Sequence, residues 1–489
     1  MSLRSPELAA GTADPRAACQ GVVALPGRLE AWQRELLGDP GRLARWLDRY
    51  GSPLNVLEPA LLARNAGELT AAATATGTDL RIFFARKANK ALAFVDEARR
   101  LNLGVDVASE RELAQTLGRG VPASDIVVTA AVKPPALLSL CVDSGVTVVI
   151  DNADELEALA RLAGAASRRV PVALRLAPAL AGAARPTRFG LGAAQLASLA
   201  GGLAPEPSSS LTVSGVHFHL DGYDAGERVT ALDQSVELVD ELRRLGHDPT
   251  FIDMGGGIPM SYLDDDTGWQ RFWEEHCAAL RGEREPLTFD GHGLGLVAHR
   301  GEIFGRANVY PYFQQPTRAA WLELILRSSV SGPTIAGLLR DRGLQLRCEP
   351  GRSLLDGAGL TAARVEFRKQ RDDGTWLIGV AMNRTQCRST SEDFLVDPLL
   401  LRVADPARRQ ATGPIEGYLV GAYCIERELL TWRRMRFPAG VAVGDLVVFP
   451  NTAGYLMHIL ESASHQIPLA RNVIRSAAGM PSLDPIDAA

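Results

Sequence analysis

The chain has 489 residues, a formal net charge of −5 at pH 7 and 46% hydrophobic residues. This length exceeds what one hydrophobic core usually supports, so we expect two domains. The weak negative charge argues against nucleic acid or an anionic membrane as partner, and no apolar run approaches the roughly 20 residues of a membrane-spanning helix. The six cysteines form no CxxC pair or zinc spacing, which predicts a reducing, cytoplasmic location.

Strand and helix signals alternate through the middle of the chain. They follow a disordered leader predicted at 1–20, without the apolar core of a signal peptide, and an N-terminal segment at 21–58 that we expect to join a β domain. Eight apolar runs have the character of buried parallel strands. These runs lie at 82–85, 104–107, 126–129, 146–150, 172–176, 213–217, 251–254 and 344–348. Eight strands interleaved with helices predict a (β/α)8 TIM-like barrel over 59–358, with its chemistry at the carboxyl ends of the strands.

Two segments depart from this alternation. Residues 262–340 exceed what one α/β repeat needs, so we expect a partly helical insertion near the barrel mouth. It could be a lid or a substrate-recognition element, and surface decoration is an equal alternative. From residue 359 to 489, short β-rich runs follow one another without long helices, which predicts an all-β domain of the β-sandwich or Greek-key kind.

Lys87 directly follows the first barrel strand. It is one of only four lysines, with Lys90, Lys133 and Lys369, among 52 basic residues. Lysine can lose its proton when it is desolvated and form a Schiff base, whereas arginine cannot. A lysine that extends its amine to solvent from a strand end is the alternative that this segment leaves open.

Polar or conformationally special residues also follow the other predicted strands. They are Asp106 with Ser109, Asp151, Arg175, His219, the triple glycine Gly255–Gly257, and Glu349. Core packing alone does not account for such a concentration at strand ends. The sequence therefore predicts a functional site at this end of the barrel.

Seven short motifs occur in the order typical of one enzyme family. They are Ala85–Asn89, Gly104–Ser109, Arg188–Gly190, His217–His219, Gly255–Gly257, Glu349–Arg352 and Ala453–Tyr455. Together they resemble the fold-type III pyridoxal-phosphate decarboxylases, which include diaminopimelate, ornithine and arginine decarboxylases and share the alanine-racemase barrel. The resemblance covers roughly residues 50–465 outside the insertion. It implies pyridoxal 5′-phosphate as the cofactor and an amino acid as the substrate.

The resemblance implies a role for each matching residue. Lys87 would form the Schiff base with the cofactor, and His219 would stack on its pyridine ring. Glu349 would keep the ring nitrogen protonated, where alanine racemases place an arginine. The residues implied to contact the rest of the cofactor, including its phosphate, are Asp106, Gly255, Gly256, Gly257, Gly351, Arg352 and Tyr455.

Other interpretations stay open at several of these positions. The three glycines could be only a turn between a strand and a helix, and Glu349 could form a salt bridge with Arg352. His217 and His219 could bind a metal ion, but hydrolytic barrels expect further His and Asp ligands on later strands. We therefore predict no metal.

Residues of the β domain are implied to act in a partner's active site. Cys424 resembles a cysteine that the family supplies across a dimer interface as a candidate proton donor. Tyr455 matches a tyrosine near the cofactor phosphate. The resemblance therefore implies a homodimer with shared active sites. A small buried strand residue is the alternative for Cys424.

The substrate pocket departs from the family pattern. The family follows its cysteine with an acidic residue, whereas here Ile425 comes next and the acid is Glu426. The segment that ends at Gly222 lacks the serine expected on the cofactor phosphate. The candidate substrate contacts are Arg175, Arg352, Arg388 and Glu426. The pattern predicts a decarboxylase with a non-standard substrate, either free or tethered to a carrier protein.

The leading hypothesis is thus a pyridoxal-phosphate-dependent amino-acid decarboxylase, similar to diaminopimelate decarboxylase. One alternative is a racemase or epimerase, in which the Cα proton leaves and CO₂ is retained. Another is a decarboxylase homologue without catalysis that binds the cofactor and regulates partners. The joint presence of Lys87, Cys424 and Glu349 argues against the second alternative.

Overall fold

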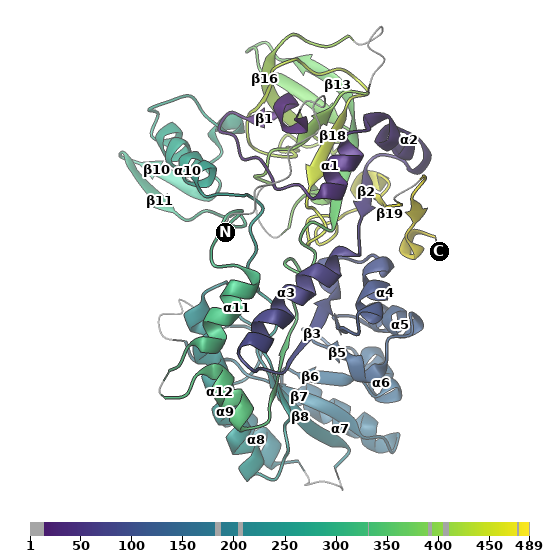
Figure 1. Cartoon of the computed structure of the whole chain (residues 1–489), viewed down its shortest axis with the longest axis vertical. Coiled ribbons are helices and arrows are strands. Elements are labelled where there is room, and N and C mark those ends of the chain that lie inside the picture. The colour runs from purple at the N-terminus through teal and green to yellow at the C-terminus, as the bar shows by residue number, and fades with distance from the viewer. Residues whose placement is uncertain are drawn as a thin grey trace. The chain divides into compact units, whose positions relative to one another are not determined.

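The computed structural model describes residues 14–180, 187–203, 209–330, 332–389, 394–403, 410–476 and 479–488. Most of the leader predicted at 1–20 lies outside these ranges. The chain divides into two compact units. The barrel unit comprises Pro59–Met260 and Gln315–Asp356, and the β unit comprises Met1–Glu58, Ser261–Gln314 and Gly357–Ala489. Both are drawn in Figure 1, and each is described by itself.

All eight predicted barrel strands are present in the barrel unit. They are β3 (Leu80–Ala85), β4 (Gly104–Val107), β5 (Ile126–Val128), β6 (Thr147–Ile150), β7 (Val170–Arg175), β8 (Leu211–His217), β9 (Phe251–Asp253) and β12 (Gln345–Cys348). Every pair of neighbours is parallel, and β12 closes the barrel because Leu346 lies opposite Leu80 of β3 and Ile252 of β9. The predicted (β/α)8 barrel is therefore confirmed.

Helices accompany the barrel strands (Figure 1). They are α3 (Leu61–Ala75), α4 (Leu92–Arg100), α5 (Glu110–Gly118), α6 (Pro135–Ser144), α7 (Ala153–Ala165), α8 (Ala193–Gly201), α9 (Ala225–Arg244), α11 (Arg318–Arg327) and α12 (Ile335–Asp341). The sequence starts several of them with a side-chain cap: Ser109, Asn152 and Asp224 each accept a hydrogen bond from a backbone N–H in the first turn. These caps fix where each helix begins after its strand.

The β unit contains a ten-stranded sheet. Its strands are β1 (Gln20–Gly21), β2 (Leu54–Leu57), β13 (Gly359–Gln370), β14 (Trp376–Val380), β15 (Leu399–Leu401), β16 (Ile415–Val420), β17 (Met435–Phe437), β18 (Leu446–Pro450), β19 (Arg471–Ile474) and β20 (Ser482–Leu483). The long strand β13 pairs with β2, β14 and β18. Helices α1 (Ala31–Leu37) and α2 (Pro40–Tyr50) belong to the same unit. The predicted second, sheet-containing domain is therefore present.

The predicted insertion at 262–340 divides between the two units. Its first part belongs to the β unit and holds α10 (Thr267–Leu280) and the hairpin of β10 (Leu296–His299) and β11 (Glu302–Gly305). Its last part, α11 and most of α12, belongs to the barrel unit, where α11 packs against α3 and α9. The buried face of α11, formed by Trp321, Leu322, Ile325 and Leu326, explains this division.

Within the part of the chain that the structure describes, no helix combines the length and the apolar character that crossing a membrane requires.

Candidate active site

A cavity of about 220 Å³ lies at the carboxyl ends of the barrel strands. Residues from six of the strand ends line it, together with the segment that follows β7. The lining residues are Lys87, Ala108, Thr129, Ala131, Arg175, Arg188, Phe189, His217, His219 and Glu349. The predicted concentration of polar side chains at this end of the barrel is therefore a real cluster.

The amine of Lys87 is held between carboxylates in this cavity. Lys87 lies in a 3₁₀ turn (Arg86–Ala88) directly after β3, and its side chain is 32% exposed. Its Nζ donates a hydrogen bond to Asp106 Oδ2 at 2.7 Å and lies 3.9 Å from Glu349 Oε2. Thr129 Oγ1 donates to the other oxygen of Asp106. The anchored carboxylate of Asp106 thus fixes the position of the only lysine amine that lines the cavity.

Glu349 belongs to a buried hydrogen-bonded chain. Its Oε1 lies 3.2 Å from His217 Nε2, and Arg175 Nε donates to His217 Nδ1 at 3.3 Å. Since Nδ1 accepts a hydrogen bond from Arg175, Nε2 carries the imidazole hydrogen and donates to Glu349. Burial lowers the pKa of His217 well below its usual value, so the ring is neutral near pH 7. His217 therefore orients Glu349 without adding a charge.

Arg175 is the first donor in this series of hydrogen bonds. It is 4% exposed, and its Nη1 and Nη2 donate to Asp151 Oδ1 and the carbonyl of Thr129, both at 2.9 Å. Arg175 was predicted to bind substrate. In the structure its three donor nitrogens serve Asp151, Thr129 and His217, so its observed contacts position His217.

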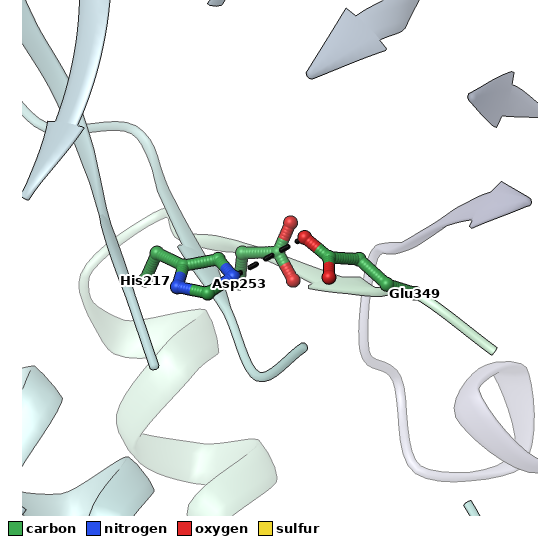
Figure 2. Close-up of side chains that lie close together, drawn as sticks. All are labelled: His217, Asp253 and Glu349. Atoms are coloured by element: carbon green, nitrogen blue, oxygen red, sulfur yellow. Dashed lines mark hydrogen bonds and ion pairs between the residues drawn. The ribbon is translucent and has the colours of Figure 1, made fainter. Parts of the chain in front are cut away.

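Asp253 forms a buried cluster with His217 and Glu349. Figure 2 shows Asp253 beside His217 and Glu349, and one ligand-type atom from each of the three lies within 4.8 Å of the others. Burial and the repulsion of Glu349 raise the pKa of Asp253 well above its usual value, and burial also raises the pKa of Glu349. A metal ion at this place would face the cations Lys87 and Arg175. The donor set thus suits a shared proton better than a metal.

His219 lines the same cavity as Lys87, two residues after His217. Burial, followed by the charge of Lys87, lowers its pKa well below the usual value, so its imidazole is neutral. Phe189 meets it edge to face with ring centroids 6.4 Å apart, and Arg188 lies 4.0 Å above the ring of Phe189. A neutral, flat imidazole that is held by an aromatic neighbour fits the stacking role that the sequence predicted for it.

The triple glycine forms a turn that only glycine allows. Gly255 and Gly257 have φ values of +65° and +77°, a region that other residues rarely adopt. A Cβ on Gly255 would lie 2.7 Å from the carbonyl of Phe218, and one on Gly256 would lie 2.9 Å from the carbonyl of Glu349. Asp253 Oδ1 accepts a hydrogen bond from Gly255 N at 2.9 Å and so holds the turn. This bare, fixed backbone fits a phosphate group.

The remaining predicted residues occur in three settings. Arg352 and Gly351 lie in the turn after Glu349, in the barrel unit. Cys424 and Glu426 are exposed in the segment after β16 of the β unit, and Cys424 is the one exposed cysteine of the six. The alternative of a buried strand cysteine is therefore wrong. Tyr455, also in the β unit, is partly buried with a φ of +71°.

Arg388 was predicted to contact the substrate, and in the structure its side chain is buried within the β unit. Its Nη2 donates to the carbonyl of Leu429 at 2.5 Å, and its guanidinium lies 5.9 Å from the ring of Trp432. It thereby supports the segment that follows Cys424. Whether it also meets substrate stays a prediction.

A second pocket, of about 600 Å³, lies where the insertion meets the segment after Cys424, within the β unit. His292 of the insertion stacks on Trp432 with ring centroids 4.0 Å apart, and Arg427 lies 4.9 Å from the ring of Trp432. Phe289 N donates to the carbonyl of Trp432 at 2.8 Å. Glu426 also lines this pocket. The insertion thus changes the surroundings of the acid that the sequence predicted to select the substrate.

Comparisons with known proteins agree with this geometry. A family model described as "Pyridoxal-dependent decarboxylase, pyridoxal binding domain" matches residues 65–301. The uncharacterized protein y4yA of Sinorhizobium fredii is 31% identical, over 94% of this chain and 96% of its own length. The chain belongs to the fold-type III pyridoxal-phosphate-dependent decarboxylase family. Its cofactor is pyridoxal 5′-phosphate.

More distant relatives within the family support the same assignment. The diaminopimelate decarboxylase of Pseudomonas aeruginosa is 24% identical, over 86% of this chain and 87% of its own. A crystal structure of diaminopimelate decarboxylase from M. jannaschii in complex with L-lysine has a TM-score of 0.66 at 19% identity. It covers 90% of this chain and 91% of that one. This likeness shows that the fold is shared.

Two residues beside Glu349 had no part in the leading sequence hypothesis: His217 and Asp253. They stood inside or beside recognised motifs, and only the tertiary structure shows that they lie close to Glu349.

Proposed function

We propose that this protein decarboxylates an amino acid and that Lys87 is the residue to which the cofactor aldehyde attaches. The observation that carries the proposal is the amine of Lys87 in a barrel cavity, 2.7 Å from Asp106 and 3.9 Å from Glu349. Bound pyridoxal phosphate supplies the electron sink for the electron pair that is released as the bond to the carboxylate breaks. The chain's own residues position the reactants and hold the protons.

Each cavity residue has a distinct part in this proposal. Asp106 orients the Lys87 amine and balances its charge while it is protonated. Glu349, oriented through Oε1 by His217, would hold a proton at the ring nitrogen, which the arginine of a racemase would not do. His219 would cover one face of the ring as a neutral imidazole. Gly255–Gly257 would receive the phosphate through backbone N–H groups.

We further propose a homodimer in which Cys424 protonates the substrate carbon in the partner's site. Its support is the exposure of Cys424 in the β unit, together with the family membership, because a proton donor has to be accessible. Two-fold symmetry would give two equivalent sites, each completed by the other protomer. Sedimentation of the purified protein, and complementation between Lys87→Ala and Cys424→Ala protomers, test this arrangement.

The substrate, on this proposal, is neither simple diaminopimelate nor ornithine. Ile425 is 44% exposed where the family has an acid, and Glu426 lies in a pocket whose walls include the stacked His292 and Trp432. Aromatic and cationic groups beside that acid favour a substrate whose distal end is larger, and less simply cationic, than a lysine-type amine. A carrier-tethered amino acid would satisfy the same requirement.

The test is a screen of amino acids, in both enantiomers and with N-substituted and extended forms, for CO₂ release and for hydrogen exchange at Cα. The proposal expects CO₂ release that depends on Lys87. Exchange at Cα without CO₂ release would favour a racemase, and cofactor absorbance with neither CO₂ release nor exchange would favour the non-catalytic regulator. Trp432→Ala is expected to change the preferred substrate while the cofactor content stays that of the wild type.

A further inference from the structure

Arg228 is a buried cation without a carboxylate partner. It lies in the first turn of α9 and is 0% exposed. Its Nη2 donates to the carbonyls of Leu220 at 3.1 Å and Gly222 at 3.2 Å, while its Nη1 is buried with no hydrogen-bond partner. Among the ion pairs of the residues that the structure describes, none includes Arg228. A fully buried guanidinium in this state lacks the anion that such groups normally require.

The burial of Arg228 disfavours its charged form and therefore lowers its pKa. Burial lowers the pKa of Arg228 to about 10, and the acidic groups of Glu227, Asp221 and Tyr223 offset the effect only in part. Arginine is effectively always protonated, so Arg228 keeps its charge. Another interaction therefore has to offset the free-energy cost of burying that charge. A residue that served only packing would be better replaced by an apolar side chain of similar size.

The guanidinium is held beside the triple-glycine turn. A Cβ on Gly257 would collide with Arg228 Nη2, so only a bare backbone fits between the arginine and the turn. The guanidinium carbon also lies 5.9 Å from the ring of Trp321, whose Nε1 donates to the carbonyl of Tyr223 at 2.8 Å. The charge is thus fixed at one place, at the edge of the turn that fits a phosphate.

The segment between β8 and α9 offers no serine or threonine beside the turn. Residues 218–224 are Phe-His-Leu-Asp-Gly-Tyr-Asp, and the carbonyl of Gly222 is one of the two that Arg228 binds. A buried cation without an anionic partner therefore lies against the glycine turn. We propose that Arg228 supplies the positive charge that balances the cofactor phosphate at Gly255–Gly257. This inference rests on the proposed function, since it requires the cofactor in the barrel.

The experiment compares two ligands that differ only in the phosphate. Cofactor-free protein is titrated with pyridoxal phosphate and with pyridoxal, and the absorbance of the bound form gives each dissociation constant. For the wild type, the inference expects pyridoxal phosphate to bind at least about 100-fold more tightly than pyridoxal, and inorganic phosphate to compete with it. Equal affinities, or no competition, would overturn the inference without any variant.

The variants then assign the effect to this arginine. Arg228→Met is expected to weaken the binding of pyridoxal phosphate about 10- to 100-fold, to leave that of pyridoxal within about threefold and to weaken competition by phosphate by a similar factor. Arg228→Lys keeps the positive charge and is expected to recover most of the preference for pyridoxal phosphate over pyridoxal. It also serves as the second variant if Arg228→Met does not fold. Arg244→Met, which removes an exposed arginine from the same helix, is the matched control and should bind both ligands as the wild type does.

If Arg228→Met binds both ligands more weakly by the same factor, or keeps the wild-type ratio of the two dissociation constants, Arg228 does not bind the phosphate. Borohydride trapping of the wild type separates this result from a failure of the proposed function. If the wild type traps cofactor at Lys87 but Arg228→Met keeps its ratio, only the inference falls. If the wild type traps none, the proposed function itself is wrong.

Discussion

The buried link between His217 and Glu349 gives a sharp prediction. In His217→Leu, Glu349 Oε1 would lose a hydrogen bond of 3.2 Å and Arg175 Nε one of 3.3 Å, both in the interior. A hydrogen bond to a charged group is worth about 1.5–3 kcal/mol, and these distances are at or slightly beyond the long end of the normal range, so we take about 1.5 kcal/mol for each. We expect the free energy of unfolding to fall by about 3 kcal/mol, measured by urea denaturation.

Only the Glu349 bond bears on the reaction, so about 1.5 kcal/mol, or roughly tenfold, is expected in kcat for CO₂ release. Because His217 donates to the ionised carboxylate, its loss should also raise the pKa of Glu349 and move the acidic limb of the kcat profile to higher pH. His217→Gln keeps a donor and should retain most of kcat. A His217→Leu enzyme with full cofactor content, wild-type kcat and an unshifted profile would refute the reasoning.

Three further predictions concern the buried charges. Burial depresses the pKa of His217 and His219, so below about pH 6.5 the unfolded chain binds protons that the folded chain refuses. Urea titrations of cofactor-free protein should therefore show stability falling from pH 7 to 5 by up to about 1.4 kcal/mol per histidine per pH unit, and His217→Leu should lose part of that dependence. Asp253, with its raised pKa, contributes stability below about pH 3.9 that is lost as pH rises through its folded pKa. The unfolding free energy of Asp253→Asn should therefore exceed that of the wild type by about 1–3 kcal/mol at pH 8, and should not exceed it at pH 4. A variant that is less stable than the wild type at both pH values contradicts this. Lys133 donates to Glu155 at 2.8 Å with both side chains buried, so Lys133→Met should cost about 3–5 kcal/mol in urea, and adding Glu155→Gln should recover part of it; additive losses would argue against the pair.

The barrel was predictable because its information is local. Most of the strands are short apolar runs, several of them β-branched, and some helices begin with a cap such as Ser109 or Asn152, so strand and helix follow from a few neighbouring residues. The candidate site was predictable for the same reason, since Lys87, Asp106 and Glu349 directly follow or end their strands. Parallel strands then bring those ends together, and the structure places the Lys87 amine within 4 Å of both acids.

What could not be predicted depends on distant contacts. Arg175 follows the pattern of a substrate-binding arginine at a strand end, yet Asp151, Thr129 and His217 surround it in space. The division of the insertion depends on which surface buries α11, and periodicity does not reveal that surface. Arg228 shares its helical spacing with ordinary surface arginines, and only the tertiary structure shows its burial.

The central claim is that Lys87 carries the cofactor. The direct measurement is borohydride reduction of the protein loaded with pyridoxal phosphate, followed by mass spectrometry of its peptides. With only four lysines in the chain, each candidate gives a distinguishable peptide or fragment series. The account predicts one reduced pyridoxyl group on Lys87, absent in Lys87→Ala and present in the matched control Lys90→Arg. A label on Lys90, Lys133 or Lys369 of the wild type, or trapping that persists in Lys87→Ala, would contradict it.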